Sequence, residues 1–451
     1  MTAGPDVIFC LLMNNLASNA QHISTERDAA RRAALGCMVT LAVVLGIGRF
    51  AFTPLLPLML HGSALGQPQI DIQHGGWLAS FNYAGYFVGA VTCAALRVEP
   101  ARMVRAGLVA TVLLTLAMGV TSQFWVWAAV RFVAGAASAW TFVFASQWGL
   151  RRLAELGAHG WGGVIYTGPG MGIVGTGLLV SAAGGYGATA GWIGFGLIAA
   201  VLSIVVWPVF GAASVSSARN ANAQVADSAG AADANQRIAG RYPTSQHATN
   251  PTPAIPTPRR ADAFWLVLLY GVPGFGYIIT ATFLPVIARH ALPGSSWPDL
   301  FWPMFGAALM VGALLAARLP AHWDNRALLA GCYVLQASGI ALGIVWPTAG
   351  GFSLGSILIG LPFTAITLFA MREARRLRGE DAAGLMGYAT AAYGVGQIVG
   401  PLVAAPIAEQ TGSFSPALWL AAGALMLGAA GLIVVARVPR NRGRMPDCRC
   451  D

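Results

Sequence analysis

Long apolar segments recur along the chain, and short polar stretches separate them. Each segment is close to or longer than the ~20 residues that an α-helix needs to cross the hydrocarbon core of a bilayer. We therefore predict an all-α membrane protein with twelve transmembrane helices. The predicted spans cover residues 33–60, 75–96, 101–121, 123–149, 161–184, 187–210, 263–289, 301–319, 326–346, 349–371, 383–407 and 416–437.

The longest polar interruption lies between the sixth and seventh spans. It is rich in Ala, Ser, Asn, Thr and Pro, a composition that buries too little apolar surface to fold, so we predict a flexible linker; a Pro-rich docking peptide is the alternative.

The residues before the first span are predicted to form a cytoplasmic extension. The alternative is that translation starts nearer Met13, so that the first residues are not part of the protein. The predicted organisation is a cytoplasmic extension (1–32), a first six-helix half (33–210), a disordered cytoplasmic linker (211–262), a second six-helix half (263–438) and a cytoplasmic tail (439–451).

Composition supports a membrane protein. The chain is 56% apolar and 10% charged, with a mean hydropathy of +0.63, whereas soluble domains carry roughly 25% charged residues. The net charge of +10 does not indicate nucleic-acid binding, because all 27 basic residues are Arg and they lie in small groups between apolar segments rather than in one patch. An ordinary water-soluble enzyme is excluded.

The distribution of Arg predicts the topology. All but three of the 27 Arg residues fall on one face if the amino terminus is cytoplasmic, as the positive-inside rule requires. The exceptions are Arg289, in an outer loop, and Arg49 and Arg131, within spans. The Arg-rich composition without Lys is typical of a GC-rich bacterial genome. We therefore predict a multi-pass protein of the bacterial inner (plasma) membrane with both termini cytoplasmic.

The two halves are similar in sequence. GIGRFAFTPLLP at 46–57 aligns without a gap with GFGYIITATFLP at 274–285, and Ile173-Val174-Gly175 aligns with Ile398-Val399-Gly400 at nearly the same offset. Such pairings, in order and at nearly one offset, indicate two six-helix pseudo-repeats. Duplicated halves that meet at a site near the membrane midplane are typical of transporters.

These segments resemble the major facilitator superfamily. The stretch 46–59 is similar to the first helix of its YbfB/YjiJ branch, and 274–285 is similar to the seventh helix of that branch. Arg131 and Gly135 match the Arg-x-x-Gln-Gly pattern of helix four, with Ala134 in place of Gln. The resemblance implies a secondary active transporter that moves a small solute by alternating access. We expect a monomer in a lipid bilayer.

Two charged loops are candidates for gating. The superfamily pattern Gly-x-x-x-Asp-Arg-x-Gly-Arg lies between helices two and three; here the loop keeps basic residues and lacks the Asp and the Gly. Charges at such loops can pair between helix ends and favour one gate state; alternatively they are only topology signals. The predicted gating residues are Arg97, Arg102, Arg105, Arg318, Asp324 and Arg326.

Arg49 and Arg131 are the only charges expected at depth in the spans, since every acidic residue falls outside the spans or at their edges. Intramembrane charges are costly and indicate function. Arg binds a carboxylate or phosphate through a bidentate fork, so an organic anion is the expected solute class. The alternative is that backbone carbonyls, Tyr hydroxyls or water satisfy both groups. Coupling stays open, because no carboxylate is visible within the bundle.

Other polar or aromatic residues at similar depth are candidates for lining the cavity, with helix-to-helix hydrogen bonding as the alternative. The predicted solute-binding set is Arg49, Asn82, Tyr86, Arg131, Tyr166, Tyr277, Thr280, Tyr393 and Gln397.

Enzymatic chemistry is not expected. The spans lack a central Asp, Glu, His or Cys pair for acid–base or metal chemistry, and a chain without Lys cannot complete a G-x-x-x-x-G-K-[ST] loop. The six Cys show no metal-ligand spacing apart from Cys448 and Cys450. We expect no catalytic residue, no metal, no cofactor and no nucleic-acid partner. A drug or metabolite efflux antiporter and a transport-fold sensor or scaffold are alternative functions.

Overall fold

The computed structural model describes residues 26–62, 69–211, 257–320, 322–379 and 382–437. Every regular element among these residues is a helix. Most of the predicted extension, most of the linker and the tail lie outside the described residues, so those three assignments stay predictions.

Twelve long helices form the bundle in the described part of the chain. They are Glu26–His61, which contains η1 (Ala42–Ile47) and α2 (Phe52–His61), then α3 (Ile72–Thr92), α4 (Pro100–Val120), α5 (Phe124–Glu155), α7 (Gly168–Ala183), α8 (Gly187–Val206), α10 (Thr257–Ala291), α11 (Pro298–Arg318), α12 (Asn325–Val345), α13 (Ala349–Gly360) continued by α14 (Phe363–Arg378), α15 (Ala382–Thr411) and α16 (Ser415–Arg437).

Eleven of these helices in the described part of the chain are long and apolar enough to cross a membrane. The twelfth is α3, which has 21 residues but a lower apolar content because it carries Gln73, His74, Asn82 and several Tyr and Gly. It packs between α5 and α15, inside the bundle, where polar groups find partners. The predicted all-α fold with twelve transmembrane helices is confirmed.

Several helices extend beyond the predicted spans. The α10 helix begins at Thr257, before the predicted start at residue 263, and α14 ends at Arg378, after the predicted end at residue 371. The additional turns are polar. Hydropathy detects only the part of a helix that lies in hydrocarbon, so it misses polar turns that continue beyond it.

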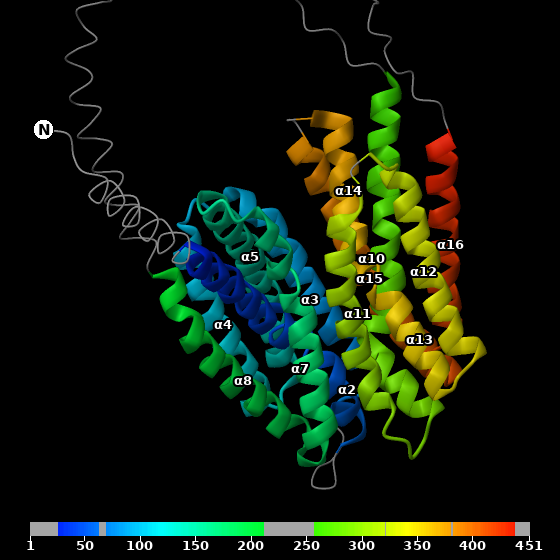
Figure 1. Cartoon of the computed structure of the whole chain (residues 1–451). Coiled ribbons are helices and arrows are strands. Elements are labelled where there is room, and N and C mark those ends of the chain that lie inside the picture. Colours follow the sequence, from blue (N-terminus) through cyan, green and yellow to red (C-terminus); the bar gives the residue numbers. More distant parts are fainter. Residues whose placement is uncertain (1–25, 63–68, 212–256, 321, 380–381, 438–451) are drawn as a thin grey trace, which may run out of the picture.

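The bundle consists of two halves (Figure 1). The helices up to α8 form the first half and those from α10 onward form the second. The halves pack through two pairs of helices, α3 with α15 and α7 with α11, and through α2 with α10. We call the end at which α10 begins and α16 ends the linker end, and the opposite end the far end. The ribbons of the two halves lie close together at the far end and diverge toward the linker end.

The first transmembrane helix is broken near its middle. Its regular α-helix gives way to the π-helical turn η1 at Ala42–Ile47 and then to an irregular turn at residues 48–51 before α2 begins. The Gly48 N–H donates to the Val43 carbonyl at 2.9 Å, which is the i→i−5 pattern of a π-helix.

Pro54 explains why one carbonyl is released at the break. Proline has no N–H, so the Phe50 carbonyl accepts a bond from the Thr53 N–H instead, at 3.2 Å. The Arg49 carbonyl, which would accept from Thr53 in a regular helix, is thereby freed. The break places Arg49 in a turn at the junction of the two halves.

Candidate functional site

The Arg49 side chain links the two halves. It is only 5% exposed, and its Nη2 donates a hydrogen bond to Oε1 of Gln397 on α15 at 3.0 Å. The Gln397 Nε2 in turn donates to the Tyr277 hydroxyl on α10. A chain of three polar side chains thus runs from the broken first helix into the second half.

Aromatic rings surround the guanidinium. The Arg49 Cζ lies 4.1 Å from the centroid of the Tyr86 ring, 5.1 Å from that of Tyr83 and 5.2 Å from that of Phe50. Such contacts stabilise a cation by roughly 0.5–2 kcal/mol each. The Arg49 Nε is buried and has no hydrogen-bond partner, and no ion pair to Arg49 occurs among the described residues.

A stack of tyrosines continues from this cation into the second half. The rings of Tyr277 and Tyr393 lie 5.9 Å apart at 23°, and those of Tyr393 and Tyr270 lie 5.0 Å apart at 25°. Phe363 meets Tyr277 edge-on at 5.0 Å. We call Arg49, Tyr83, Tyr86, Tyr277, Tyr393 and Gln397 the central cluster.

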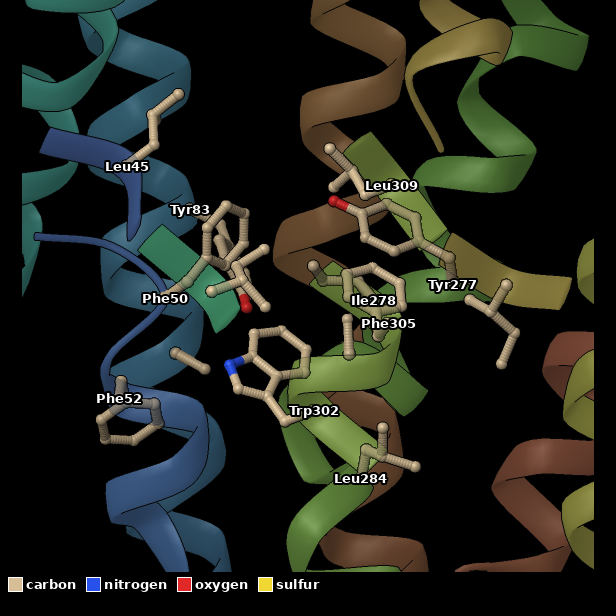
Figure 2. Packing of buried hydrophobic residues seen from close by; sticks show 14 of the residues in the cluster. Leu45, Phe50, Phe52, Tyr83, Tyr277, Ile278, Leu284, Trp302, Phe305 and Leu309 are labelled. Atoms are coloured by element: carbon tan, nitrogen blue, oxygen red, sulfur yellow. The ribbon is translucent and has the colours of Figure 1, made fainter. Parts of the chain in front are cut away.

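Further contacts between the halves lie beside the central cluster, toward the far end. The Thr53 hydroxyl donates to the Ala281 carbonyl at 3.0 Å, the Ser80 hydroxyl donates to the Ile398 carbonyl at 2.9 Å, and the Tyr83 and Thr282 hydroxyls are 2.9 Å apart. Figure 2 shows Phe50 and Tyr83 of the first half pointing toward Trp302 and Ile278 of the second.

The partners of Arg131 are backbone carbonyls. Both terminal nitrogens of its guanidinium donate to the freed Arg49 carbonyl at 3.4 Å, and its Nε donates to the Leu78 carbonyl at 3.4 Å. The Phe52 ring lies 4.6 Å from its Cζ. These contacts match the alternative in which backbone carbonyls satisfy Arg131, and they make it a support for the turn that carries Arg49.

The remaining predicted solute-binding residues lie elsewhere. Asn82 donates to the Arg131 carbonyl at 2.8 Å, a bond between α3 and α5. Tyr166 packs against Phe142 with ring centroids 6.3 Å apart. Thr280 lines a small pocket inside the second half, between α10, α12, α13 and α16. Of the nine predicted residues, the central cluster brings together five, namely Arg49, Tyr86, Tyr277, Tyr393 and Gln397.

The predicted gating residues lie at the linker end and make mostly local contacts. Arg102 pairs with Glu99 at 2.9 Å, and the Arg105 Cζ lies 5.2 Å from the centroid of the Trp207 ring. Arg97 and Arg318 are exposed.

Arg326 is the best anchored of the predicted gating residues. It pairs with Asp324 at 3.0 Å and donates to the Val435 carbonyl of α16 at 2.6 Å.

One buried carboxylate was missed by the sequence analysis. Glu373 on α14 is 1% exposed and accepts a hydrogen bond from Asn325 Nδ2 at 3.2 Å. Its neighbours Arg372, Arg375 and Arg376 made the segment resemble a charged loop. An amphipathic helical pattern across residues 363–378 was the signal available in the sequence.

At the far end, Asp71 caps α3 by accepting a bond from the His74 N–H at 2.7 Å. Partial burial raises the pKa of the Asp71 carboxyl, but the bonds from His74 outweigh it and leave the pKa below its usual value. The carboxylate therefore stays ionised in the position that a helix N-terminus favours.

A helical bundle in two halves, with buried polar side chains where the halves meet, is the architecture typical of membrane transporters built from internal repeats. The chain belongs to the family described as "Uncharacterised MFS-type transporter YbfB", whose model matches residues 41–239 and 236–434. The resemblance to this branch of the major facilitator superfamily, inferred from the motifs, is confirmed. The protein is therefore a multi-pass membrane protein of this transporter family.

Two further comparisons agree with this assignment. The chloramphenicol resistance protein of Streptomyces lividans is 32% identical over 196 residues, which cover 40% of this chain and 45% of that relative. The chain thus matches less than half the length of that relative. Among solved structures, a mutant of the nucleoside transporter NupG has a similar fold, with a TM-score of 0.64, 12% identity, and coverage of 89% of this chain and 99% of that chain. At this identity, the similarity concerns the fold alone.

Proposed function

We propose that the protein carries an organic anion across the membrane by alternating access, and that Arg49 is the cation that binds it between the two halves. The proposal rests on two neighbouring nitrogens of the Arg49 guanidinium, of which only one has a hydrogen-bond partner. Nη2 donates to the neutral amide of Gln397, while Nε is buried without a partner.

Nε and Nη2 lie on the same edge of an arginine side chain and form a fork that matches the two oxygens of a carboxylate. The single Gln397 oxygen satisfies only one prong of that fork. A solute carboxylate at the same place accepts hydrogen bonds from both Nε and Nη2 and supplies a negative charge to pair with the guanidinium. A buried cation without a charged partner is unfavourable, so this site favours binding of an anion.

The arrangement of the halves supports a state that is closed at the far end. The bonds from Thr53, Ser80 and Tyr83 to the second half lie toward that end, and the ribbons diverge toward the linker end. With the linker end cytoplasmic, as the Arg distribution predicts, this state faces inward. The protein then acts as a monomer in the bacterial plasma membrane, with no catalytic step and no cofactor.

Arg49 variants test the proposal. Purified protein is screened by thermal shift against small carboxylates and phosphate esters, since a ligand that binds only the folded state raises the melting temperature. The best ligand is then measured for uptake into proteoliposomes. We expect the dissociation constant to rise roughly tenfold to a hundredfold in Arg49→Gln, because one charge-assisted contact contributes about 1.5–3 kcal/mol. Arg49→Lys keeps the charge without the fork and should be at best partly active.

Arg151→Gln is the matched control, because Arg151 is exposed at the end of α5. An unchanged thermal shift and unchanged uptake in Arg49→Gln contradict the proposal, as does loss of folded protein in both Arg49 variants, which makes Arg49 a structural residue. Ligand binding without uptake identifies a sensor instead of a transporter.

Drug efflux is a second candidate, favoured by the similarity to the chloramphenicol resistance protein of Streptomyces lividans. Chloramphenicol carries no carboxylate, so its export should not depend on the fork of Arg49. Raised chloramphenicol tolerance in cells that express the protein, retained in Arg49→Gln, would support efflux over anion transport.

A further inference from the structure

The aromatic side chains around Arg49 point to a narrower class of solute; this inference rests on the proposed function. We propose that the solute is an aromatic monocarboxylate, with its carboxylate on Arg49 and its ring packed against the tyrosines of the central cluster.

The charge of the cluster fits one negative group. Arg49 is its one cation, and its other polar groups are tyrosine hydroxyls and the Gln397 amide, which are neutral. Arg131 does not add a second binding charge, because its three nitrogens face the carbonyls of Arg49 and Leu78. A dicarboxylate or a phosphate dianion would bring a second charge to a site with no group to pair it, at the cost of desolvation.

The lining of the cluster fits an aromatic ring. The faces of Tyr277 and Tyr393 are stacked, and Tyr86 presents its face to the guanidinium. Aromatic rings prefer offset-stacked or edge-to-face contacts with other aromatic rings, beyond the contribution of the apolar area they bury. Phe363, edge-on to Tyr277, extends this aromatic wall on the second half.

The same lining does not fit a polyhydroxylated acid. Selectivity for hydroxyl-rich solutes needs several buried hydrogen-bonding groups, because each unpaired hydroxyl costs free energy. The cluster offers one amide, Gln397. Asn82 lies outside the cluster, where its Nδ2 donates to the Arg131 carbonyl and its Oδ1 has no hydrogen-bond partner.

The binding geometry follows from the contacts present. Gln397 Oε1 holds the place of one carboxylate oxygen, at 3.0 Å from Arg49 Nη2. An entering carboxylate displaces this amide and gains the bond from Nε, so solute binding breaks the polar link from the first half to Gln397. The tyrosines beside the amide then meet the ring attached to the carboxylate.

The test compares the binding of four small probes to the purified full-length protein by isothermal titration. Benzoate has the charge and the ring, cyclohexanecarboxylate has the charge and a saturated ring, benzamide has the ring without charge, and phthalate carries two charges. We expect benzoate to bind about three- to tenfold more tightly than cyclohexanecarboxylate, and more tightly than benzamide or phthalate.

Variants connect this preference to the cluster. Tyr393→Leu should bring the affinities for benzoate and cyclohexanecarboxylate close together, whereas Tyr393→Phe should retain the preference for benzoate. Tyr388→Leu is the control on the same helix, since Tyr388 is 71% exposed, and it should leave the preference unchanged.

The outcomes separate this inference from the proposed function. Equal affinities for benzoate and cyclohexanecarboxylate, both lost in Arg49→Gln, overturn the aromatic class and leave anion binding in place. Benzamide binding as tightly as benzoate overturns both, whereas no binding of any of the four probes overturns the aromatic class and leaves the proposed function to the screen of carboxylates and phosphate esters. A preference for benzoate that survives in Tyr393→Leu removes Tyr393 from the site and overturns the proposed placement of the ring.

Discussion

The two halves share one helix crossing but carry different side chains at it. Gly46 in the first helix packs against the backbone of Gly172 in α7, and its repeat counterpart Gly274 in α10 packs against the backbone of Tyr393 in α15. In both places an added Cβ would overlap backbone atoms of the facing helix. The duplicated unit therefore retains the close approach of its first and fifth helices in both copies.

The side chains that follow this crossing differ between the halves. Three residues beyond the paired glycines, the first half has Arg49 and the second has Tyr277. The position of Gly172 in the repeat is held by Gln397 in the second half. The first half supplies the cation and the second supplies the amide and hydroxyl that receive it. A duplicated scaffold thus gives a site that neither half forms alone.

The first helices of the two halves also differ in continuity. The α10 helix stays continuous although it contains Pro273 and Pro285, while the first helix is interrupted at Arg49. A local interruption frees a carbonyl that must find another donor in the bilayer. Arg131 of α5 is that donor.

The linker ends of the halves also differ. In the first half, Arg105 lies over Trp207, and Trp148 packs against Phe210 with centroids 4.8 Å apart. In the second half, Arg326 is held by Asp324 and by a carbonyl of α16, and Glu373 accepts a bond from Asn325. The second half thus holds buried ionic and polar groups at this end, whereas an ion pair of the first half, Arg102 with Glu99, is exposed.

The largest effect is expected from adding a methyl group where the first and fifth helices of each half pack closely together. Gly46→Ala and Gly274→Ala should each destabilise the protein by more than about 3 kcal/mol, because the added methyl meets backbone that cannot rotate away. Yield of folded protein and melting temperature in detergent measure the effect. Gly175→Ala and Gly331→Ala are the controls, since an added Cβ meets nothing within 4 Å at either position. A large loss at only one of the two crossings would show that the halves pack differently there.

A substitution at Gln397 tests whether the solute binds the edge of Arg49 that the second half contacts. Gln397→Glu places a carboxylate of the protein itself opposite Arg49, at the place proposed for the solute. We expect the dissociation constant for the anion to rise at least about a hundredfold, because the site is already occupied by a like charge, while the melting temperature rises. The isosteric change leaves the volume of the cluster unchanged. Retained anion binding in this variant would mean that the solute does not use the edge of Arg49 that faces Gln397.

The sequence predicted the helices and the repeat well, because both depend on hydropathy and on residues that recur at a fixed offset. It also identified Arg49 and Gln397 separately. Their contact joins residues 348 positions apart in the chain, and no local pattern encodes such a pairing. Thr280 was expected to line the same cavity as Tyr277 because it lies at a similar depth, yet it lines a pocket within the second half; depth along a helix does not determine the direction of a side chain, which turns by about 60° over three residues.

A substitution at Arg131 has the smallest expected effect. It distinguishes a role in supporting the turn that carries Arg49 from a role in binding the solute. Its guanidinium donates to the freed Arg49 carbonyl, so Arg131→Gln, which keeps a shorter donor, should cost about 1–2 kcal/mol of stability by weakening that bond. The dissociation constant for the anion should rise less than about tenfold, because Arg49 keeps its own fork and loses only part of its positioning. Thermal unfolding and titration of the same preparation measure the two quantities. A loss of affinity as large as that in Arg49→Gln, with stability unchanged, would instead place Arg131 in contact with the solute and give the first half two binding cations.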